Sequence, residues 1–259
     1  MTPGSGTSGT EGTGSRARRR RRRPSGYLRL ERELWARGLE RVAGVDEAGR
    51  GPLAGPVFAA AVILLPGKLI RGVDDSKLLT GQRRERLAVR IRERAVAWAL
   101  GAASTREVDR LNILRASHLA MRRALARLRA EPQHVVVDGL PVRDLWPKCE
   151  CTAVVDGDQL CHAVACASIL AKVYRDRVMR RLAGRYPGYG WDTNVGYGTA
   201  EHREAIGRLG VTPHHRLTFA PLQLTLELGD DGPATSAAEL DDPGLDAPAG
   251  SDAVLPEPR

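Results

Sequence analysis

The chain has 259 residues, of which 42% are hydrophobic, and carries a formal net charge of +9 at pH 7. No apolar run approaches the roughly 18 to 20 residues that span a bilayer, and the Gly/Ser/Thr-rich and then Arg-rich N-terminus lacks the apolar segment of a secretory signal. The composition therefore argues against a membrane protein, and we expect a cytoplasmic protein with a sizeable buried core.

The two ends of the sequence differ in composition from its middle. Residues 1–25 end in a nearly continuous Arg run, and residues 229–259 are rich in Asp, Ala, Pro and Gly. We expect both ends to be disordered, because like charges repel and neither end has a helical or strand period. A single folded domain is then expected over 26–228. Its excess of basic residues suggests a polyanionic partner, although an Arg-rich solvated surface would account for the charge equally well.

Strands and helices are expected to alternate along this domain. In chain order the hydrophobic pattern predicts a helix over 27–39, strands over 42–46 and 57–65, a helix over 82–94, a strand over 96–103, a long helix over 108–129, strands over 134–137 and 152–155, a helix over 161–182 and helical turns over 200–209. Such alternation indicates an α/β fold.

Acidic residues stand at or just after three of the predicted strands. They are Asp46 and Glu47, Asp138, and Asp158. Ligands collect at strand ends in α/β sheets, and crowded carboxylates favour a hard divalent cation such as Mg²⁺ or Mn²⁺. Successive strand residues point to opposite faces, so Asp46 and Glu47 share one site only if the glycine-rich turn that follows redirects Glu47. The same acids could instead be helix caps and turn residues.

The motifs around these acids resemble those of the ribonuclease HII family. The resemblance begins at the segment 45–57, VDEAGRGPLAGPV, and continues in the family's order. The later segments are DSK at 75–77, LNIL at 111–114, VDG at 137–139, ASILAKVYRD at 167–176, GYGT at 196–199, HHR at 214–216 and FAP at 219–221. With HHR and FAP counted as one C-terminal motif, these are seven ordered matches, which are highly specific and cover about 42–222.

This resemblance implies a fold and a reaction. The expected fold is the ribonuclease H-like one, a mixed central sheet flanked by helices with a C-terminal helical extension. The implied reaction is metal-dependent hydrolysis of RNA joined to DNA, including single ribonucleotides in duplex DNA, leaving 3′-hydroxyl and 5′-phosphate ends. By resemblance, Asp46, Glu47, Asp138 and Asp158 are the catalytic residues and the ligands of Mn²⁺ or Mg²⁺.

The resemblance also implies residues that contact the substrate, an RNA–DNA hybrid or a ribonucleotide-containing duplex. Gly49, Arg50 and Gly51 would approach the sugar and read its 2′-hydroxyl, and Tyr197 would pack on the sugar at the junction. Lys77 and Lys172 are candidates for contacting phosphate. A core role for Tyr197 and structural ion pairs for the two lysines are the alternatives.

Several positions are left open by the sequence. Asp156 departs from the family's usual residue at its position, so we align Asp158 with the fourth acid. Val195 departs from the residue usual before Gly196 and Tyr197, which leaves one phosphate contact open. His214 and His215 could relay protons or could be buried or capping residues. The four cysteines match no common zinc spacing and are expected to be reduced thiols.

Two other functional classes remain as alternatives. A nucleic-acid-binding protein without activity would account for the basic charge, but an acid set facing phosphate argues against it. Another nuclease of the same fold, such as a junction resolvase or ribonuclease HIII, is the second alternative; the Gly-Arg-Gly turn disfavours ribonuclease HIII. We expect a monomer.

Overall fold

The computed structural model describes residues 27–73, 79–220 and 222. Its centre is a five-stranded sheet in the order β3-β2-β1-β4-β5. The strands are β1 (Val42–Ala48), β2 (Val57–Ile63), β3 (Ala97–Ala103), β4 (His134–Asp138) and β5 (Cys151–Val154). β1, β2 and β3 are antiparallel neighbours, whereas β4 and β5 run parallel to β1. The mixed sheet confirms the expected α/β class.

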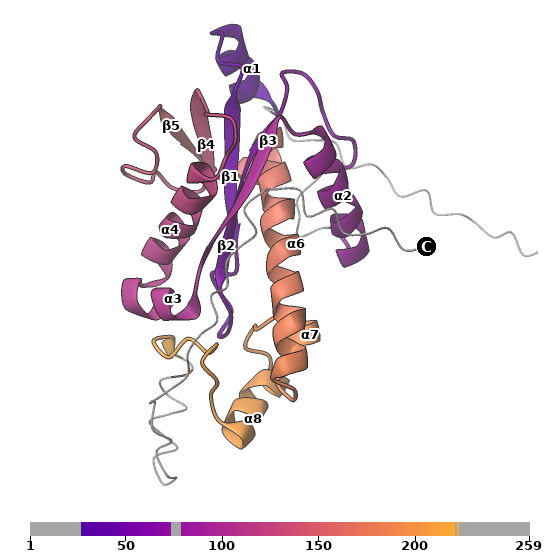
Figure 1. The fold of residues 1–259 in the computed structure, drawn as a ribbon, viewed down its shortest axis with the longest axis vertical. Coiled ribbons are helices and arrows are strands. Elements are labelled where there is room, and N and C mark those ends of the chain that lie inside the picture. The colour runs from indigo at the N-terminus through magenta and orange to yellow at the C-terminus, as the bar shows by residue number, and fades with distance from the viewer. Residues whose placement is uncertain (1–26, 74–78, 221, 223–259) are drawn as a thin grey trace, which may run out of the picture.

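Helices cover both faces of this sheet (Figure 1). The helices are α1 (Arg29–Ala36), α2 (Gly81–Arg94), α3 (Thr105–Leu111), α4 (Ile113–Ala126), α5 (Gly157–Leu160), α6 (His162–Arg185), α7 (Trp191–Asn194) and α8 (Ala200–Leu209). None of the helices in these ranges combines the length and apolarity of a membrane span.

The strand β2 is buried on both of its faces and joins two cores. Ala60 and Val62 pack with α2 and α6, while Ala59 and Ala61 pack with α4. This alternation follows from the pleat, because successive side chains leave a strand on opposite sides. Two strand glycines lie at close helix crossings: a Cβ on Gly44 would lie 2.2 Å from the Ala163 carbonyl carbon, and one on Gly101 would lie 2.1 Å from the Ala120 oxygen.

The expected single helix over 108–129 is wrong. The chain breaks at Asn112, where φ is 68° and ψ is 163°, and forms α3 and α4 instead. Asn112 accepts a hydrogen bond from the Arg115 amide and so caps α4, while Ser104 and Glu107 form a capping box at the start of α3. A short polar side chain that bonds its own backbone competes with helix continuation, which accounts for the break.

The C-terminal part forms a third core beyond the end of the sheet. Residues of α6, α7 and α8 pack there with Leu53 and Ala54, around the fully buried Trp191. In Figure 1 the lower end of α6 reaches α7, and α8 lies beyond the sheet. This arrangement matches the expected C-terminal helical extension. The residues 1–26 and 223–259, which include both expected tails, lie outside the described ranges.

Candidate active site

Two of the predicted site acids lie on neighbouring strands. β1 and β4 are parallel, with Val45 opposite Val137. Asp46 and Asp138 are the next residues of the two strands, so they sit side by side where the pairing ends. The site therefore follows from the sheet order, because parallel neighbours bring their carboxyl ends to one edge.

Glu47 leaves β1 on the opposite side from Asp46. The strand stays regular through both residues, pairing Asp46 with Ala60 and Glu47 with Ala59, and ends only at Ala48. Ala48 packs in the core on the α6 side and Val45 in the core on the α4 side, so alternation assigns Asp46 to the first side and Glu47 to the second. The following turn does not redirect Glu47 within the strand.

The acids nevertheless act on one another electrostatically. Burial, and then the neighbouring charges of Glu47 and Asp138, raise the pKa of Asp46 well above its usual range. A hydrogen bond with the Ser168 side chain and another from the Glu47 amide, 2.6 Å long, oppose this rise. Burial also raises the pKa of Glu47, against the lowering effect of Arg50. Asp46, Glu47 and Asp138 are thus close enough that the negative charge of each is costly to the others, although Glu47 leaves β1 on the other side.

Asp158 directly follows a residue that is bonded to Asp138, at the start of α5. The Gly157 amide donates to Asp138 Oδ1 at 2.7 Å, and Asp158 follows as a buried residue in the first turn of the helix. Asp156, the residue that departs from the family pattern, is exposed and has φ of 56°. The turn therefore buries Asp158 and leaves Asp156 in solvent, which agrees with aligning Asp158 to the fourth acid.

The four acids suit a hard divalent cation by their chemistry. Oxygen donors are the preferred ligands of Mg²⁺ and Mn²⁺, and a cation would relieve the repulsion that raises the pKa of Asp46. Within the described ranges, however, no three His, Cys, Asp or Glu side chains are grouped so that they could hold a metal as they stand. Glu47 Oε1 instead accepts from Arg50 at 3.2 Å. The chemistry of the donor set fits such an ion, although in the described residues these side chains are not gathered around one position.

The glycine-rich turn after β1 lies next to Tyr197. A Cβ on Gly51 would be 3.6 Å from Tyr197 Cε1, and the Tyr197 side chain is 45% exposed. That exposure argues against the alternative of a core tyrosine. A surface that pairs a backbone turn with an aromatic ring is suited to a sugar, since the ring packs on it while the backbone approaches closely.

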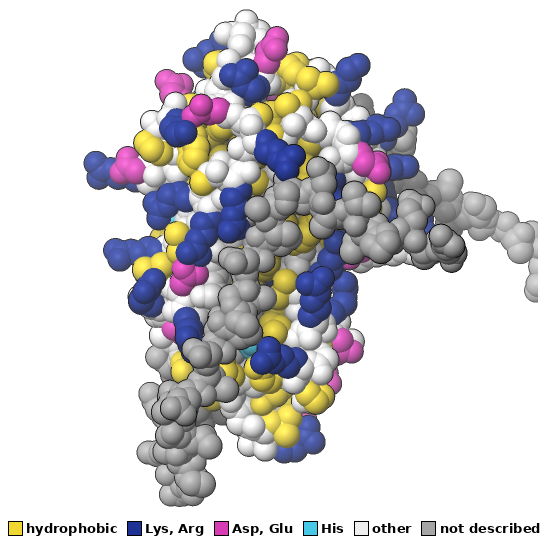
Figure 2. Space-filling model, viewed as in Figure 1, with side chains coloured by type: hydrophobic (Ala, Val, Ile, Leu, Met, Phe, Trp, Pro, Cys, Tyr) yellow, Lys and Arg dark blue, Asp and Glu magenta, His cyan; other side chains and the backbone are white. Residues whose placement is uncertain are grey.

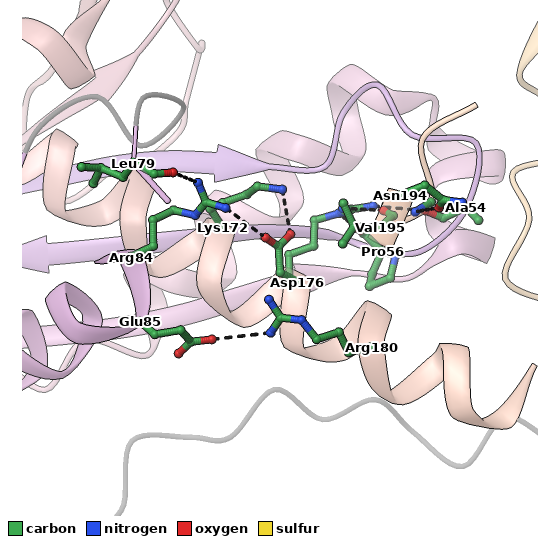
Figure 3. A network of polar contacts seen from close by, with 12 residues as sticks. Ala54, Pro56, Leu79, Arg84, Glu85, Lys172, Asp176, Arg180, Asn194 and Val195 are labelled. Carbon is green, nitrogen blue, oxygen red and sulfur yellow. Dashed lines mark hydrogen bonds and ion pairs between the residues drawn. The ribbon is translucent and has the colours of Figure 1, made fainter. Parts of the chain in front are cut away.

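Lys172 has a structural partner (Figure 3). Its Nζ lies 2.7 Å from Asp176 Oδ1, and Arg84 approaches the other oxygen of the same carboxylate at 3.7 Å. Lys172 Nζ also lies 6.0 Å from the Tyr197 ring centre. The ion pair expected as its alternative role is thus present, and the amine remains beside the sugar-binding candidate. Lys77 lies outside the described residues.

Basic residues flank the acids on the side of α4. The pKa of His118 is lowered first by burial and then by the charges of Arg122 and Arg50. Arg122 on α4 is exposed, and because it acts on the same histidine as Arg50, the two arginines lie on one flank. Lys and Arg side chains are also spread over the face drawn in Figure 2. This surface is suited to a polyanion, because each cation that contacts phosphate releases a counterion.

His214 and His215 pack against aromatic rings of the C-terminal core, including that of Trp191. His215 Nδ1 accepts from the Thr212 amide at 2.8 Å, and its Nε2 faces His202 Nε2 at 3.2 Å. Burial is the main cause that lowers the pKa of His215 to about 3, so it is neutral near pH 7. His214 packs edge-on against Tyr186. For His215 the structure supports the buried role over proton relay.

Three residues at this site were not singled out from the sequence, although each lies inside a quoted motif. Ser168 bonds Asp46, and Arg175 and Arg216 donate to the carbonyl groups of the turn that follows β1. Their place inside these motifs was the available signal, and a fully buried Arg requires several acceptors.

Comparison with known proteins gives one family. The family model described as Ribonuclease HII matches residues 43–222. A ribonuclease HII of Paracoccus denitrificans is 57% identical over 199 residues, covering 76% of this chain and 93% of the relative. One from Synechococcus sp. is 52% identical over 208 residues, covering 79% and 92%.

Solved structures agree with the fold. The ribonuclease H2 of Pyrococcus horikoshii OT3 superposes with a TM-score of 0.64 at 28% identity, covering 74% of this chain and all of the other. A Bst-RNase HIII structure in complex with Mn²⁺ superposes with a TM-score of 0.60 at 23% identity, covering 76% and 73%, and shows likeness of fold alone.

Proposed function

Because the chain belongs to the ribonuclease HII family, endoribonucleases that cleave RNA in RNA–DNA hybrids, we propose that it also cuts at single ribonucleotides within duplex DNA. The cut would leave 3′-hydroxyl and 5′-phosphate ends. The observation that carries this proposal is that the buried Asp46 and the partly buried Asp138 lie side by side, with a glycine turn after β1 and an exposed Tyr197 beside that turn.

We propose that Asp46, Glu47, Asp138 and Asp158 hold Mn²⁺ or Mg²⁺. When bound, such ions activate water and neutralise charge on the leaving oxygen. The likeness in fold to a protein solved with Mn²⁺ supports this choice of ion, as does the all-oxygen donor set. Arg50 competes for Glu47, so cation binding would release that guanidinium toward the substrate.

The remaining residues would hold the substrate. Gly49, Arg50 and Gly51 would contact the ribose, and Tyr197 would pack on the sugar at the ribonucleotide–deoxyribonucleotide junction. Lys172 and Lys77 would contact phosphate. For Lys172 the support is a side chain that is 25% exposed, with its amine 6.0 Å from the Tyr197 ring centre.

We also propose that residues 26–228 form one catalytic unit that acts as a monomer in the cytoplasm. The family match over 43–222 falls inside that range. The C-terminal core shares Leu53 and Ala54 with the segment after β1, which supports one unit over two. Size-exclusion chromatography with light scattering tests the monomer.

The decisive experiment uses three labelled duplexes of one sequence: an RNA–DNA hybrid, a DNA duplex with one ribonucleotide, and all DNA. Each is incubated with full-length protein in Mg²⁺, in Mn²⁺ and in EDTA. We expect cleavage of the first two with either metal, none in EDTA and none of the all-DNA duplex. End-labelling identifies the termini. Binding without cleavage in every metal would favour the non-catalytic alternative, and cleavage of a DNA four-way junction would favour a resolvase.

A further inference from the structure

Two arginines are fully buried behind the turn that carries Gly49, Arg50 and Gly51. Arg175 comes from the middle of α6 and Arg216 from the segment after α8, and both are 0% exposed. Each hydrogen bond that their guanidinium groups donate within the described ranges ends on a backbone carbonyl. Among the residues that the structure describes, neither arginine therefore forms one half of a buried ion pair.

Arg216 donates hydrogen bonds to three carbonyl groups of the segment between β1 and β2. Its Nη2 donates to Gly49 O at 2.6 Å and to Gly55 O at 2.8 Å, its Nη1 donates to Arg50 O at 2.9 Å, and its Nε donates to Gly55 O at 3.0 Å. The planar guanidinium fixes these acceptors relative to one another, as a single ammonium could not.

Arg175 links the segment between that turn and β2 to the loop that carries Tyr197. Its Nε donates to Pro56 O at 3.1 Å, its Nη2 to Ala54 O at 3.1 Å and its Nη1 to Val195 O at 3.0 Å. Ala54, Pro56 and Val195 lie together at one end of the network in Figure 3. One side chain thus sets the spacing between the two loops.

The backbone supports this spacing directly. The amides of Leu53 and Ala54 both donate to Gly196 O, at 2.8 Å and 3.2 Å. The turn also packs closely against Arg175, because a Cβ on Gly49 would lie 2.0 Å from Arg175 Nε. Gly51 and Tyr197, which face the substrate in the proposed function, are therefore placed by groups beneath them.

The carbonyl contacts determine where the turn's amides point. In a trans peptide the C=O of one residue and the N–H of the next point in opposite directions. Because the Gly49 and Arg50 carbonyls turn inward to Arg216, the amides of Arg50 and Gly51 are directed away from it. Two successive outward N–H groups form a donor pair of the kind that binds an oxygen ligand.

Burying two positive charges that form no ion pair with any described residue carries an energetic cost. Burial lowers the pKa of Arg175 to about 10 and of Arg216 to about 9, and both remain charged at neutral pH. A packed apolar side chain would avoid this desolvation, so stability alone is a poor reason for these arginines. Such costs concentrate where a backbone must be held in one geometry.

We propose that Arg216 and Arg175 are positioning residues for ribose recognition: they aim the Arg50 and Gly51 amides and set their distance from Tyr197, so that a ribonucleotide binds better than a deoxyribonucleotide. This proposal rests on the proposed cleavage at ribonucleotides.

The test measures discrimination within one reaction. A labelled duplex with one ribonucleotide is cleaved in the presence of unlabelled all-DNA duplex of the same sequence, which yields kcat, KM and the inhibition constant Ki of the DNA. The variants are Arg216→Lys and Arg175→Lys. The control is Arg177→Lys, also on α6, whose guanidinium pairs with Glu85 at the surface. If part of a variant is unfolded, the ratio of Ki to KM is unaffected, because neither constant depends on the concentration of active enzyme.

We expect Arg216→Lys and Arg175→Lys each to lower the ratio of Ki to KM about tenfold, because small misplacements at a site are costly. The change should lie in KM for the ribonucleotide duplex, with Ki for DNA unchanged, and Arg177→Lys should keep the wild-type ratio. Equal changes in Ki and KM, or no change, would overturn the proposal.

A third variant, Asp109→Ala, tests the proposal if Arg216→Lys and Arg175→Lys do not fold. Asp109 accepts from the Leu217 and Thr218 amides at 3.1 Å and so anchors the segment that carries Arg216. Asp109→Ala should lower the same ratio at least about twofold, and an unchanged ratio would also overturn the proposal. A wild-type protein that cleaves no ribonucleotide duplex would instead refute the proposed function.

Discussion

Asp46 and Asp138 occupy equivalent places on two parallel strands, one residue beyond the paired Val45 and Val137. The pKa of Asp46 is raised by burial, by Glu47 and by Asp138, in that order. Because its neighbours already make the negative charge of Asp46 costly, a further negative group near this carboxylate would be repelled. The proposed approach of a phosphate to these acids therefore requires a cation. A substitution of Asp138 tests this requirement directly.

Asp138→Asn should reduce cleavage of an RNA–DNA hybrid by at least about 10²-fold while leaving hybrid affinity within a few-fold, because it removes a proposed ligand but no cation that contacts phosphate. Initial rates and fluorescence anisotropy measure the two effects. Asp144→Asn is the matched control, since Asp144 is exposed in the loop after β4. Activity near wild type for Asp138→Asn would show that the site is misplaced.

Gly49→Ala should lower the free energy of unfolding by about 3 kcal/mol or more. Its φ of +96° disfavours any side chain, and the added Cβ would lie 2.0 Å from Arg175 Nε. Gly38→Ala separates the two causes, because Gly38 has φ of +81° but nothing within 4 Å of an added Cβ. Urea unfolding of Gly38→Ala should show that the free energy of unfolding falls by only about 1 to 2 kcal/mol. Equal losses for both would mean that the contact with Arg175 adds nothing.

Val195→Gly should raise the free energy of unfolding by up to about 1 kcal/mol. Val195 has φ of 45°, in the left-handed region that a β-branched residue avoids, and the relief should exceed the loss of its partial packing in the C-terminal core. Thermal unfolding measures the change. A lower melting temperature would mean that packing outweighs the backbone conformation at this position.

Glu107 should contribute stability that depends on pH. Its pKa is lowered from 4.5 to about 2, chiefly by the hydrogen bonds with Arg123, so the folded state binds the proton more weakly than the unfolded chain. The contribution is full above about pH 5 and is lost as the pH falls toward 2. Allowing for solvent screening, it should be about 1 kcal/mol.

Urea unfolding of Glu107→Gln and the wild type between pH 6 and pH 2 checks this. The two curves should converge as the pH falls, whereas Glu33→Gln, in an exposed pair with Arg29, should differ little from wild type at any pH. Curves of Glu107→Gln and wild type that stay parallel down to pH 2 would contradict the assigned role of Glu107.

Much of the fold could be predicted from the sequence because its strands and helices have clear hydrophobic periods. The expected strand over 57–65 is found as β2, and the expected helix over 82–94 as α2, which Thr80 caps. The break at Asn112 was missed, because the apolar period continues across it while the polar cap interrupts the backbone. The order of motifs indicated the family, which the comparison confirms.

The sequence by itself determined which acids stand at strand ends and which residues form the glycine turn, because these are local properties of chain order. Only the tertiary structure decided that β1 lies beside β4, that Asp46 and Glu47 leave opposite faces, and that Lys172 pairs with Asp176. It alone brought Arg175 and Arg216 beneath the turn, 119 and 167 positions away along the chain from residues that they bond. Such contacts depend on packing between distant segments, and no local period encodes them.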